Sequence, residues 1–292
     1  MFGKYTRLEK RNWPWIYLFL LPTLAVFCMF YIVPILTVII TTFTRWDGFN
    51  PPTFSGFTNL QRLFNSDTFL ISLRNLFAWV LIAAVIHVGY GVMIALMLHR
   101  RPAGWKFVRA VYMVPNVISV AAWAVIYNFV FNDEFGLLNG IIRLVFPNFH
   151  VIWFFESPAA FWAITFTWVF YAVIVMLIVN GNLLAIPEEL YEAAYIDGAS
   201  NWQVTRLIKL PLCRNAISTS VIVSITARIG MYEAIRLTSR GGPGDDTSNL
   251  PLILVRSIRD MNYGYANAVA LTMMVIGILL MLTVTWIFKE RD

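Results

Sequence analysis

Charged residues are scarce in this sequence. Of its 292 residues only 13% are Asp, Glu, Lys or Arg, whereas 59% are hydrophobic, and the mean hydropathy is +0.68. Soluble globular domains have about a quarter charged residues, so this composition excludes an ordinary soluble domain and predicts a membrane protein. The net charge of +6 does not indicate nucleic acid as a partner, because the chain has no block of five like charges and basic membrane-protein loops give the same balance.

Residues typical of catalytic and metal sites are also few. Cys28 and Cys213 are far apart and lack metal-ligand or redox spacing, which predicts inert thiols. His87, His99 and His150 are scattered, so we expect structural or surface roles for them and no metal site. The sequence has no P-loop, nucleophile elbow, H-E-x-x-H motif or convergent carboxylate pair. We therefore expect no catalytic residue, no bound cofactor and no ATPase activity in this chain.

Long apolar runs, in contrast, are abundant. A helix needs about 20 apolar residues to cross a bilayer core of roughly 30 Å. Six segments approach that length, at about 15–42, 74–98, 107–131, 160–185, 212–235 and 264–288. The first is too long for a signal peptide and has no small-residue cleavage site, so we expect it to remain as a span. The predicted fold is an all-α membrane protein with six transmembrane helices in a single domain over residues 1–292.

The basic residues that flank these spans predict the orientation. All five lysines, from Lys4 to Lys289, fall on one side, which the positive-inside rule assigns to the cytoplasm, although the arginines divide between both sides. Both termini are then cytoplasmic. The external loops, at about 43–73, 132–159 and 236–263, are too short to be separate domains.

The most polar long stretch, EELYEAAYIDGASNWQVTRLIKLPL at 188–212, lies between the fourth and fifth spans. Helix formers up to Ala194, the breaker Asp197-Gly198 and Ser200 as an N-cap predict a cytoplasmic helix-turn-helix that ends at Pro211. Gly198 is expected to supply a turn that a side chain would obstruct. The segment either packs on its own bundle or docks against another protein. Its position between two spans excludes a DNA-reading role.

The spacing of this stretch resembles the EAA loop of ABC importer permeases. The matching residues, within a loop at about 186–211, are Glu192, Ala193, Ala194, Gly198, Ile208, Leu210 and Pro211, with Lys209 between the last three. The resemblance implies that this loop inserts into a cleft of an ATP-binding subunit, with Glu192 as a coupling residue. It also implies two such subunits as partners, which use ATP and Mg.

Other segments are similar to sugar permeases of the maltose-transporter type. These segments are 54–64, 109–131 and 232–270, and the last contains Gly241-Gly242-Pro243. Gly-Gly-Pro is typical of the first of two permeases, so the resemblance implies a second, different permease in a prokaryotic inner membrane. It also implies an external solute-binding protein that delivers a carbohydrate. Tyr232-Glu233 replaces the usual Phe-Asp, and 237–243 has one extra residue, which leaves the substrate open.

Arg228, in the fifth span, is the sharpest candidate for a substrate contact, because an unpaired charge in a membrane costs on the order of 3 kcal/mol. Ser224 is on the same helical face, and Glu233, about 140° round the helix, is a poor partner for Arg228. A structural pair with a neighbouring helix remains an alternative. In the fourth span, Trp168 and Tyr171 suit a sugar, or serve as packing anchors. The substrate-pathway candidates are Trp168, Tyr171, Ser224, Arg228, Tyr232 and Glu233.

The predicted function is that of a permease subunit of an ATP-driven, binding-protein-dependent importer of oligosaccharides. The predicted cargo class includes acidic oligosaccharides with uronate units. The alternative cargo is glycerol phosphate or another small polyol. A secondary transporter would need acidic relays inside its spans, and Glu233 is nearly the only acid close to one. A membrane enzyme would need a catalytic constellation, which is missing.

Overall fold

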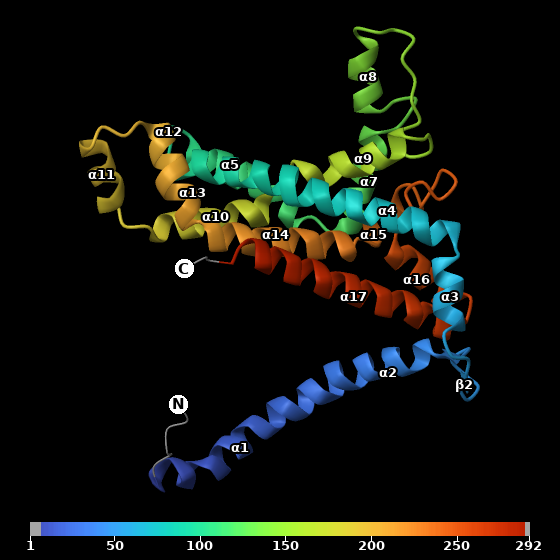
Figure 1. The fold of residues 1–292 in the computed structure, drawn as a ribbon. Coiled ribbons are helices and arrows are strands. Elements are labelled where there is room, and N and C mark those ends of the chain that lie inside the picture. The colour runs from blue at the N-terminus through green and yellow to red at the C-terminus, as the bar shows by residue number, and fades with distance from the viewer. Residues whose placement is uncertain (1–6, 290–292) are drawn as a thin grey trace.

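The computed structural model describes residues 7–289 and consists almost entirely of helices (Figure 1). Lys4 and both chain ends, whose cytoplasmic location was predicted, lie outside the described residues. The elements are α1 (Arg7–Phe27), η1 (Cys28–Ile32), α2 (Val33–Thr42), β1 (Thr44–Arg45), β2 (Thr53–Phe54), α3 (Thr58–Phe64), α4 (Asp67–Ile82), η2 (Ala83–His87), α5 (Val88–His99), α6 (Trp105–Met113), η3 (Val114–Val117), α7 (Val120–Val130), α8 (Leu137–Arg143), α9 (Ala159–Val169), α10 (Val173–Ala185), α11 (Glu189–Ile196), α12 (Asn201–Val204), η4 (Thr205–Lys209), α13 (Leu210–Leu212), α14 (Arg214–Ile229), α15 (Glu233–Leu237), α16 (Leu250–Arg259) and α17 (Tyr263–Ile287).

Within residues 7–289, four helical stretches are long and apolar enough to cross a membrane: Trp15–Thr42, Asp67–His99, Ala159–Ala185 and Tyr263–Ile287. The first and last agree closely with the predicted spans. The second begins at Asp67 rather than at 74, because the Ser66 side chain accepts a hydrogen bond from the Phe69 amide and caps α4 ahead of the apolar run.

The predicted third and fifth spans are wrong as continuous helices. The third is two helical pieces, Trp105–Val117 and Val120–Val130, that meet at 105°. Pro115 lacks an amide donor, and Ser119 caps a new helix just beyond it. The fifth ends at Ile229 instead of 235, and its other end is bent by 66° from Asn201–Leu212. The chain has six spans only if each bent pair counts as one.

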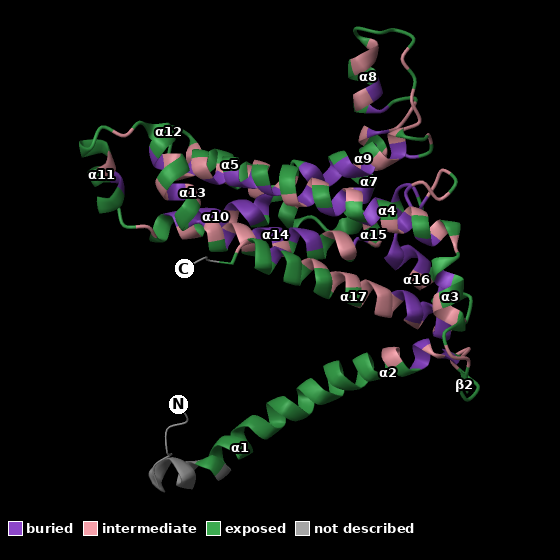
Figure 2. Cartoon of the chain, in the orientation of Figure 1, coloured by how far each residue is buried: buried purple, intermediate pink, exposed green. Residues whose placement is uncertain are grey.

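The N-terminal helix α1–η1–α2 stands apart from the other helices over most of its length (Figure 1). It packs on α17 through α2, near the β1–β2 hairpin. None of its most apolar window is buried within the chain, and Figure 2 shows it as a continuous exposed surface. In a membrane this surface contacts lipid or another protein.

The closest helix packing in the bundle is between α5 and α10. A Cβ atom added at Gly91 would lie 2.6 Å from Cβ of Val175 and 3.0 Å from Cβ of Ala172. Small residues let membrane helices approach closely, and this is the reason for glycine here. The buried residues form two clusters. One cluster follows α4, α5, α10, α14 and α17, and the other gathers around Trp79 and Trp168.

Two ends of the bundle carry the connecting segments. One end holds the β1–β2 hairpin, α3, the protruding α8 segment, α15 and α16, so the predicted external loops contain helices of their own (Figure 1). The other end holds the start of α1, the end of α17 and the α11–α13 segment (Figure 1).

Candidate functional site

A pocket of about 580 Å³ lies where three helices are interrupted. The interruptions are at 118–119 between η3 and α7, at 170–172 between α9 and α10, and at 230–232 between α14 and α15. We call this the central pocket. Its lining residues are Pro115, Asn116, Ile118, Val120, Trp123, Thr167, Trp168, Tyr171, Ala227, Arg228, Gly230, Met231, Tyr232, Glu233 and Ala234. Interrupted helices are tolerated at membrane depth where the irregular backbone is buried or lines a cavity.

Two polar side chains satisfy the backbone at the 170–172 interruption. His87 Nδ1 lies 3.2 Å from the Trp168 carbonyl oxygen and 3.0 Å from that of Val169. The Tyr112 hydroxyl donates to the Phe170 carbonyl at 3.1 Å and accepts from the Ala172 amide at 2.8 Å. Carbonyl oxygens only accept, so Nδ1 of His87 carries the proton. This is a structural role for His87, in agreement with the prediction.

Arg228 lies over the face of Trp168, with its guanidinium carbon 4.1 Å from the ring centroid. Its Nη1 is 3.6 Å from the Met231 sulfur. Among residues 7–289 no carboxylate lies within ion-pair distance of this guanidinium. The aromatic face therefore partly compensates a positive charge that has no carboxylate partner within the described chain.

Two buried polar atoms of the pocket-lining residues have no hydrogen-bond partner among the described residues. They are Nε1 of Trp168, whose residue is 6% exposed, and the hydroxyl of Tyr171. Unsatisfied buried polar atoms are uncommon, and each requires an explanation. Arg228 and the aromatic rings of Trp168 and Tyr171 line the pocket together, which is a suitable arrangement for a hydroxylated ligand with an anionic group, while the two unsatisfied atoms themselves are covered.

The structure brings five of the six substrate-pathway candidates together in this pocket: Trp168, Tyr171, Arg228, Tyr232 and Glu233. Ser224, the sixth, is 5% exposed and does not line the pocket. The predicted 140° angle for Glu233 assumed a continuous helix, and this is wrong because the helix ends at Ile229. Glu233 instead begins α15 and is exposed.

Ten of the fifteen lining residues were not among the candidates, including Pro115, Asn116, Trp123 and Met231. The run Val-Pro-Asn-Val at 114–117 contained a signal for the first two, because a proline inside an apolar run marks a probable helix interruption. Nothing comparable in the sequence marked Trp123 or Met231.

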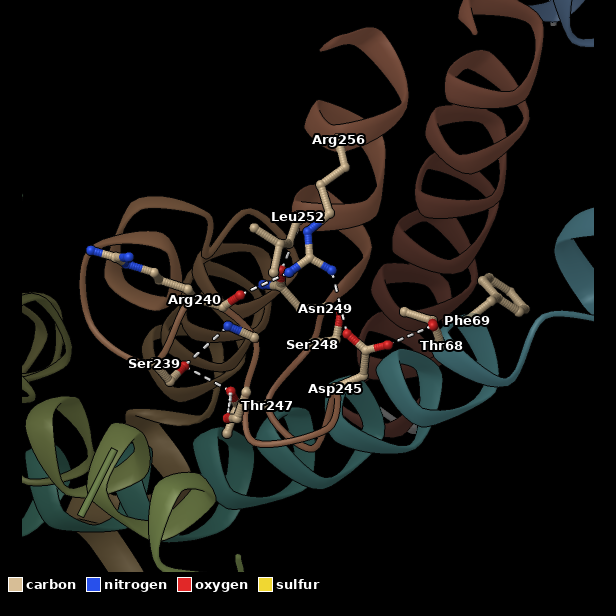
Figure 3. A network of polar contacts seen from close by, with 12 residues as sticks. Thr68, Phe69, Ser239, Arg240, Asp245, Thr247, Ser248, Asn249, Leu252 and Arg256 are labelled. Carbon is tan, nitrogen blue, oxygen red and sulfur yellow. Dashed lines mark hydrogen bonds and ion pairs between the residues drawn. The ribbon is translucent and has the colours of Figure 1, made fainter. Parts of the chain in front are cut away.

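The loop 238–249 is held against the bundle beside the pocket by a polar network (Figure 3). Oδ2 of Asp245 accepts from the Thr68 hydroxyl at 2.7 Å, and its Oδ1 accepts from Nη1 of Arg256 at 3.3 Å. Nη2 of Arg256 donates to the Arg240 carbonyl at 2.8 Å. Deeper in the bundle, the buried Asn75 amide donates to two carbonyls of the loop.

The segment α11–α13 forms two helical pieces around a turn. Ser200 caps the second piece in a capping box with Gln203, as predicted. Gly198 adopts φ +82° with no atom near its missing side chain, so the backbone conformation favours glycine here, and the predicted obstruction is absent. Pro211 lies inside α13 and does not end the helix, which runs to Leu212.

One face of this segment is exposed. Glu192, Ala193 and Pro211 are exposed, whereas Ala194, Ile208 and Leu210 are half-buried. Large apolar side chains are also exposed beside them, namely Leu190, Tyr195, Ile196, Trp202 and Leu207. Tyr191 is buried on the opposite face. Its ring lies 4.7 Å from Nζ of Lys209 within the same segment, and its centroid lies 6.0 Å from that of the His99 ring at the end of α5. Burial raises the pKa of the Tyr191 hydroxyl. An exposed apolar patch with a carboxylate in it indicates a surface for another protein.

Comparisons with known proteins agree with these observations. Residues 87–290 match the model of the family described as binding-protein-dependent transport system inner membrane component. The diacetylchitobiose uptake system permease protein of Streptomyces coelicolor is 32% identical, over 86% of this chain and 75% of that one. The trehalose/maltose transport system permease protein of Thermococcus litoralis is 28% identical, over 91% of this chain and 90% of that one.

A solved structure has the same fold. A chain of a bacterial alginate ABC transporter, crystallised with an alginate-pentasaccharide-bound periplasmic protein, superposes with a TM-score of 0.82 and 19% identity, over 97% of this chain and 98% of that one. The predicted family is thereby confirmed: the chain belongs to the family of binding-protein-dependent transport system inner membrane components, the permeases of ABC importers.

Proposed function

We propose that this chain is the permease subunit of an ATP-driven importer of oligosaccharides that carry a negative charge. The observation that carries the proposal is Arg228 in the central pocket, stacked on Trp168 at 4.1 Å beside two unsatisfied polar atoms. A cation at membrane depth without a carboxylate is costly, on the order of 3 kcal/mol by insertion scales. An anionic ligand recovers part of that cost, and a neutral sugar, which offers only hydroxyl acceptors, recovers less.

The pocket's other groups favour a sugar as the carrier of that charge. The rings of Trp123, Trp168, Tyr171 and Tyr232 supply apolar faces for a sugar ring. Trp168 Nε1 and the Tyr171 hydroxyl are covered, and a small side-chain movement would have to uncover them before they could bind a sugar hydroxyl. A volume of about 580 Å³ lies in the range of roughly 300–1,000 Å³ that encloses a whole ligand. Glycerol phosphate would satisfy Arg228 but leave much of this volume empty, so uronate oligosaccharides are the better fit.

The α11–α13 segment is the proposed coupling loop to the ATP-binding subunits. Glu192, Ala193 and Pro211 of the EAA-like pattern lie on the exposed face, beside apolar side chains such as Ile196 at 86% exposure. ATP and Mg are bound by those partner subunits, and the permease does not hydrolyse ATP. When the partners close, the segment moves with them and the bundle opens outward; hydrolysis reverses the movement.

The assembly that fits these surfaces has four kinds of partner. We propose a second, different permease, two ATP-binding subunits, an external solute-binding protein and the lipid bilayer of a prokaryotic inner membrane. The bilayer and the second permease cover the exposed N-terminal helix α1–η1–α2. Six spans, counting each bent pair as one, put the start of α1, α11 and the end of α17 on one side of the membrane. We propose that this side is the cytoplasm, because the lysines flank the spans there.

A reconstituted complex with its binding protein tests the proposal through ligand-stimulated ATPase activity. The panel contains neutral oligosaccharides, uronate oligosaccharides and glycerol phosphate, and the variants are Arg228→Ala and the control Ser224→Ala, one turn earlier on α14 and outside the pocket. We expect uronates to stimulate the wild type and Ser224→Ala but not Arg228→Ala. Stimulation by neutral sugars alone, unchanged in Arg228→Ala, would refute an acidic cargo. Copurification of an ATPase separates this function from that of a secondary transporter.

A further inference from the structure

A second, smaller pocket adjoins the central pocket and is rich in arginine. It has a volume of about 150 Å³ and lies between α15 and α16. Its lining residues are Tyr232, Arg236, Leu252, Val255, Arg256 and Arg259. We call it the arginine pocket. Its lining has three positive side chains and no acidic one, so the electrostatic potential inside favours an anion.

Only one of the three arginines has a carboxylate partner. Arg256 is paired with Asp245 at 3.3 Å and also donates to the Arg240 carbonyl (Figure 3). In the part of the chain that the structure describes, Arg236 and Arg259 make no ion pair. All three lie in the last turns of α15 and α16, where helix dipoles favour cations. The dipoles account for basic residues at each helix end, but not for a shared pocket between them.

The two pockets are adjacent, because Tyr232 lines both. A ligand held by Arg228 in the central pocket would reach Arg236 by extending around the Tyr232 side chain. At about 150 Å³, the arginine pocket is below the roughly 300 Å³ that encloses a whole ligand. It has room for one charged group of a longer molecule. The planar guanidinium of arginine matches a carboxylate in two parallel hydrogen bonds.

We propose that the arginine pocket is a second anion subsite, in which Arg236 and Arg259 bind a further carboxylate of an oligosaccharide whose first carboxylate lies on Arg228. The inference rests on the proposed function, because it requires an acidic oligosaccharide in the central pocket. It adds that the cargo carries at least two carboxylates, on different sugar units, and that the permease distinguishes such a cargo from one with a single charge.

Direct binding to the complete transporter in nanodiscs, without the binding protein, tests this inference. Isothermal titration measures the binding affinity of three ligands: a tetrauronate, a tetrasaccharide with one uronate and a neutral tetrasaccharide. Each ligand is titrated into the wild-type transporter and into the variants Arg236→Gln, Arg259→Gln and Arg228→Gln. The control for loss of one positive charge is Arg240→Gln. The Arg240 side chain lies outside both pockets and points away from Asp245 in Figure 3.

We expect Arg236→Gln and Arg259→Gln each to weaken tetrauronate binding about tenfold, the size of one charge-assisted contact, without changing binding of the single-uronate ligand. Arg228→Gln should weaken the binding of both acidic ligands. Arg240→Gln should leave the binding of both unchanged. If only Arg228→Gln has an effect, the second subsite is wrong and the proposed function stands. If the wild type does not bind the tetrauronate more tightly than the neutral sugar, both are wrong.

The arginines could instead contact carboxylates of the binding protein, and a second readout separates this outcome. In that case Arg236→Gln and Arg259→Gln would leave direct tetrauronate binding unchanged. They would also lower the ATPase stimulation by the loaded binding protein equally for neutral and acidic cargo. That pattern would overturn the subsite.

Discussion

The buried Asn75 amide holds the loop 238–249 on the bundle, and replacing it should loosen that loop selectively. Asn75 is 1% exposed, and its Nδ2 donates to the carbonyls of Asp246 at 2.8 Å and Ser248 at 3.0 Å. Asn75→Leu keeps a side chain of similar size but removes both donors. The two carbonyls then lose a buried partner.

The expected cost follows from those two bonds. A buried acceptor left unsatisfied costs about 1–3 kcal/mol, and partial rewetting of the loop reduces the sum of two such terms. We therefore expect opening of the loop to become easier by about 3 kcal/mol, which corresponds to a factor on the order of 100 in the opening equilibrium. The remaining anchors, Asp245 with Thr68 and Arg256, keep the loop attached in its native position.

Hydrogen exchange of the loop amides measures this directly, because local opening governs their exchange. The amides of Asp246 and Ser248 donate within the loop, each at 2.8 Å, and should exchange on the order of 100 times faster in Asn75→Leu. The control is Ser72→Ala, one turn earlier on α4, because the Ser72 hydroxyl is buried without a partner among the described residues. Its removal should leave exchange unchanged. Equal exchange in wild type and Asn75→Leu would show that the amide does not hold the loop.

Three further predictions concern helix packing and the coupling segment. Gly91→Ala should destabilise the purified protein by about 1–3 kcal/mol in thermal unfolding, because its Cβ would lie 2.6 Å from Val175, whereas Gly89→Ala, with nothing within 4 Å, should not. Gly198→Val should uncouple ATPase activity from transport, because φ +82° strains a branched residue, whereas Gly198→Asn should retain coupling. Equal transport per ATP hydrolysed in the two variants would contradict this prediction. Ser200→Ala should speed amide exchange in α12 roughly fivefold, a loss of about 1 kcal/mol, and unchanged exchange would show that the cap contributes nothing.

Much of the fold could be predicted where local sequence signals and the structure depend on the same physics. The spans at 15–42 and 264–288 are uniformly apolar, and the structure has helices there within a residue or two. The Ser200 cap was predictable because a capping box is made by residues three positions apart. The interruption after Pro115 could have been predicted in the same way, since proline acts on its own helix.

The interruption at 170–172 could not have been predicted, because no proline or glycine occurs there. It is stabilised by His87 and Tyr112, which are about 80 and 60 residues earlier in the chain and which bond the freed backbone groups. The same contacts place Trp168 and Tyr171 beside Arg228. Their convergence is thus a property of tertiary packing, even though each residue was a candidate by its type.

The polar residues around the central pocket divide into two groups. His87, through Nδ1, and the Tyr112 hydroxyl bond the interrupted backbone. Trp168 Nε1 and the Tyr171 hydroxyl are next to the same interruption but have no partner among the described residues. An unsatisfied polar atom of a pocket-lining residue is a candidate for ligand contact, whereas an unsatisfied atom away from the central pocket, such as the Ser72 hydroxyl, is not. If Trp168 and Tyr171 contact the cargo as proposed, their substitution should change specificity, whereas substitution of His87 or Tyr112 should reduce stability before it changes specificity.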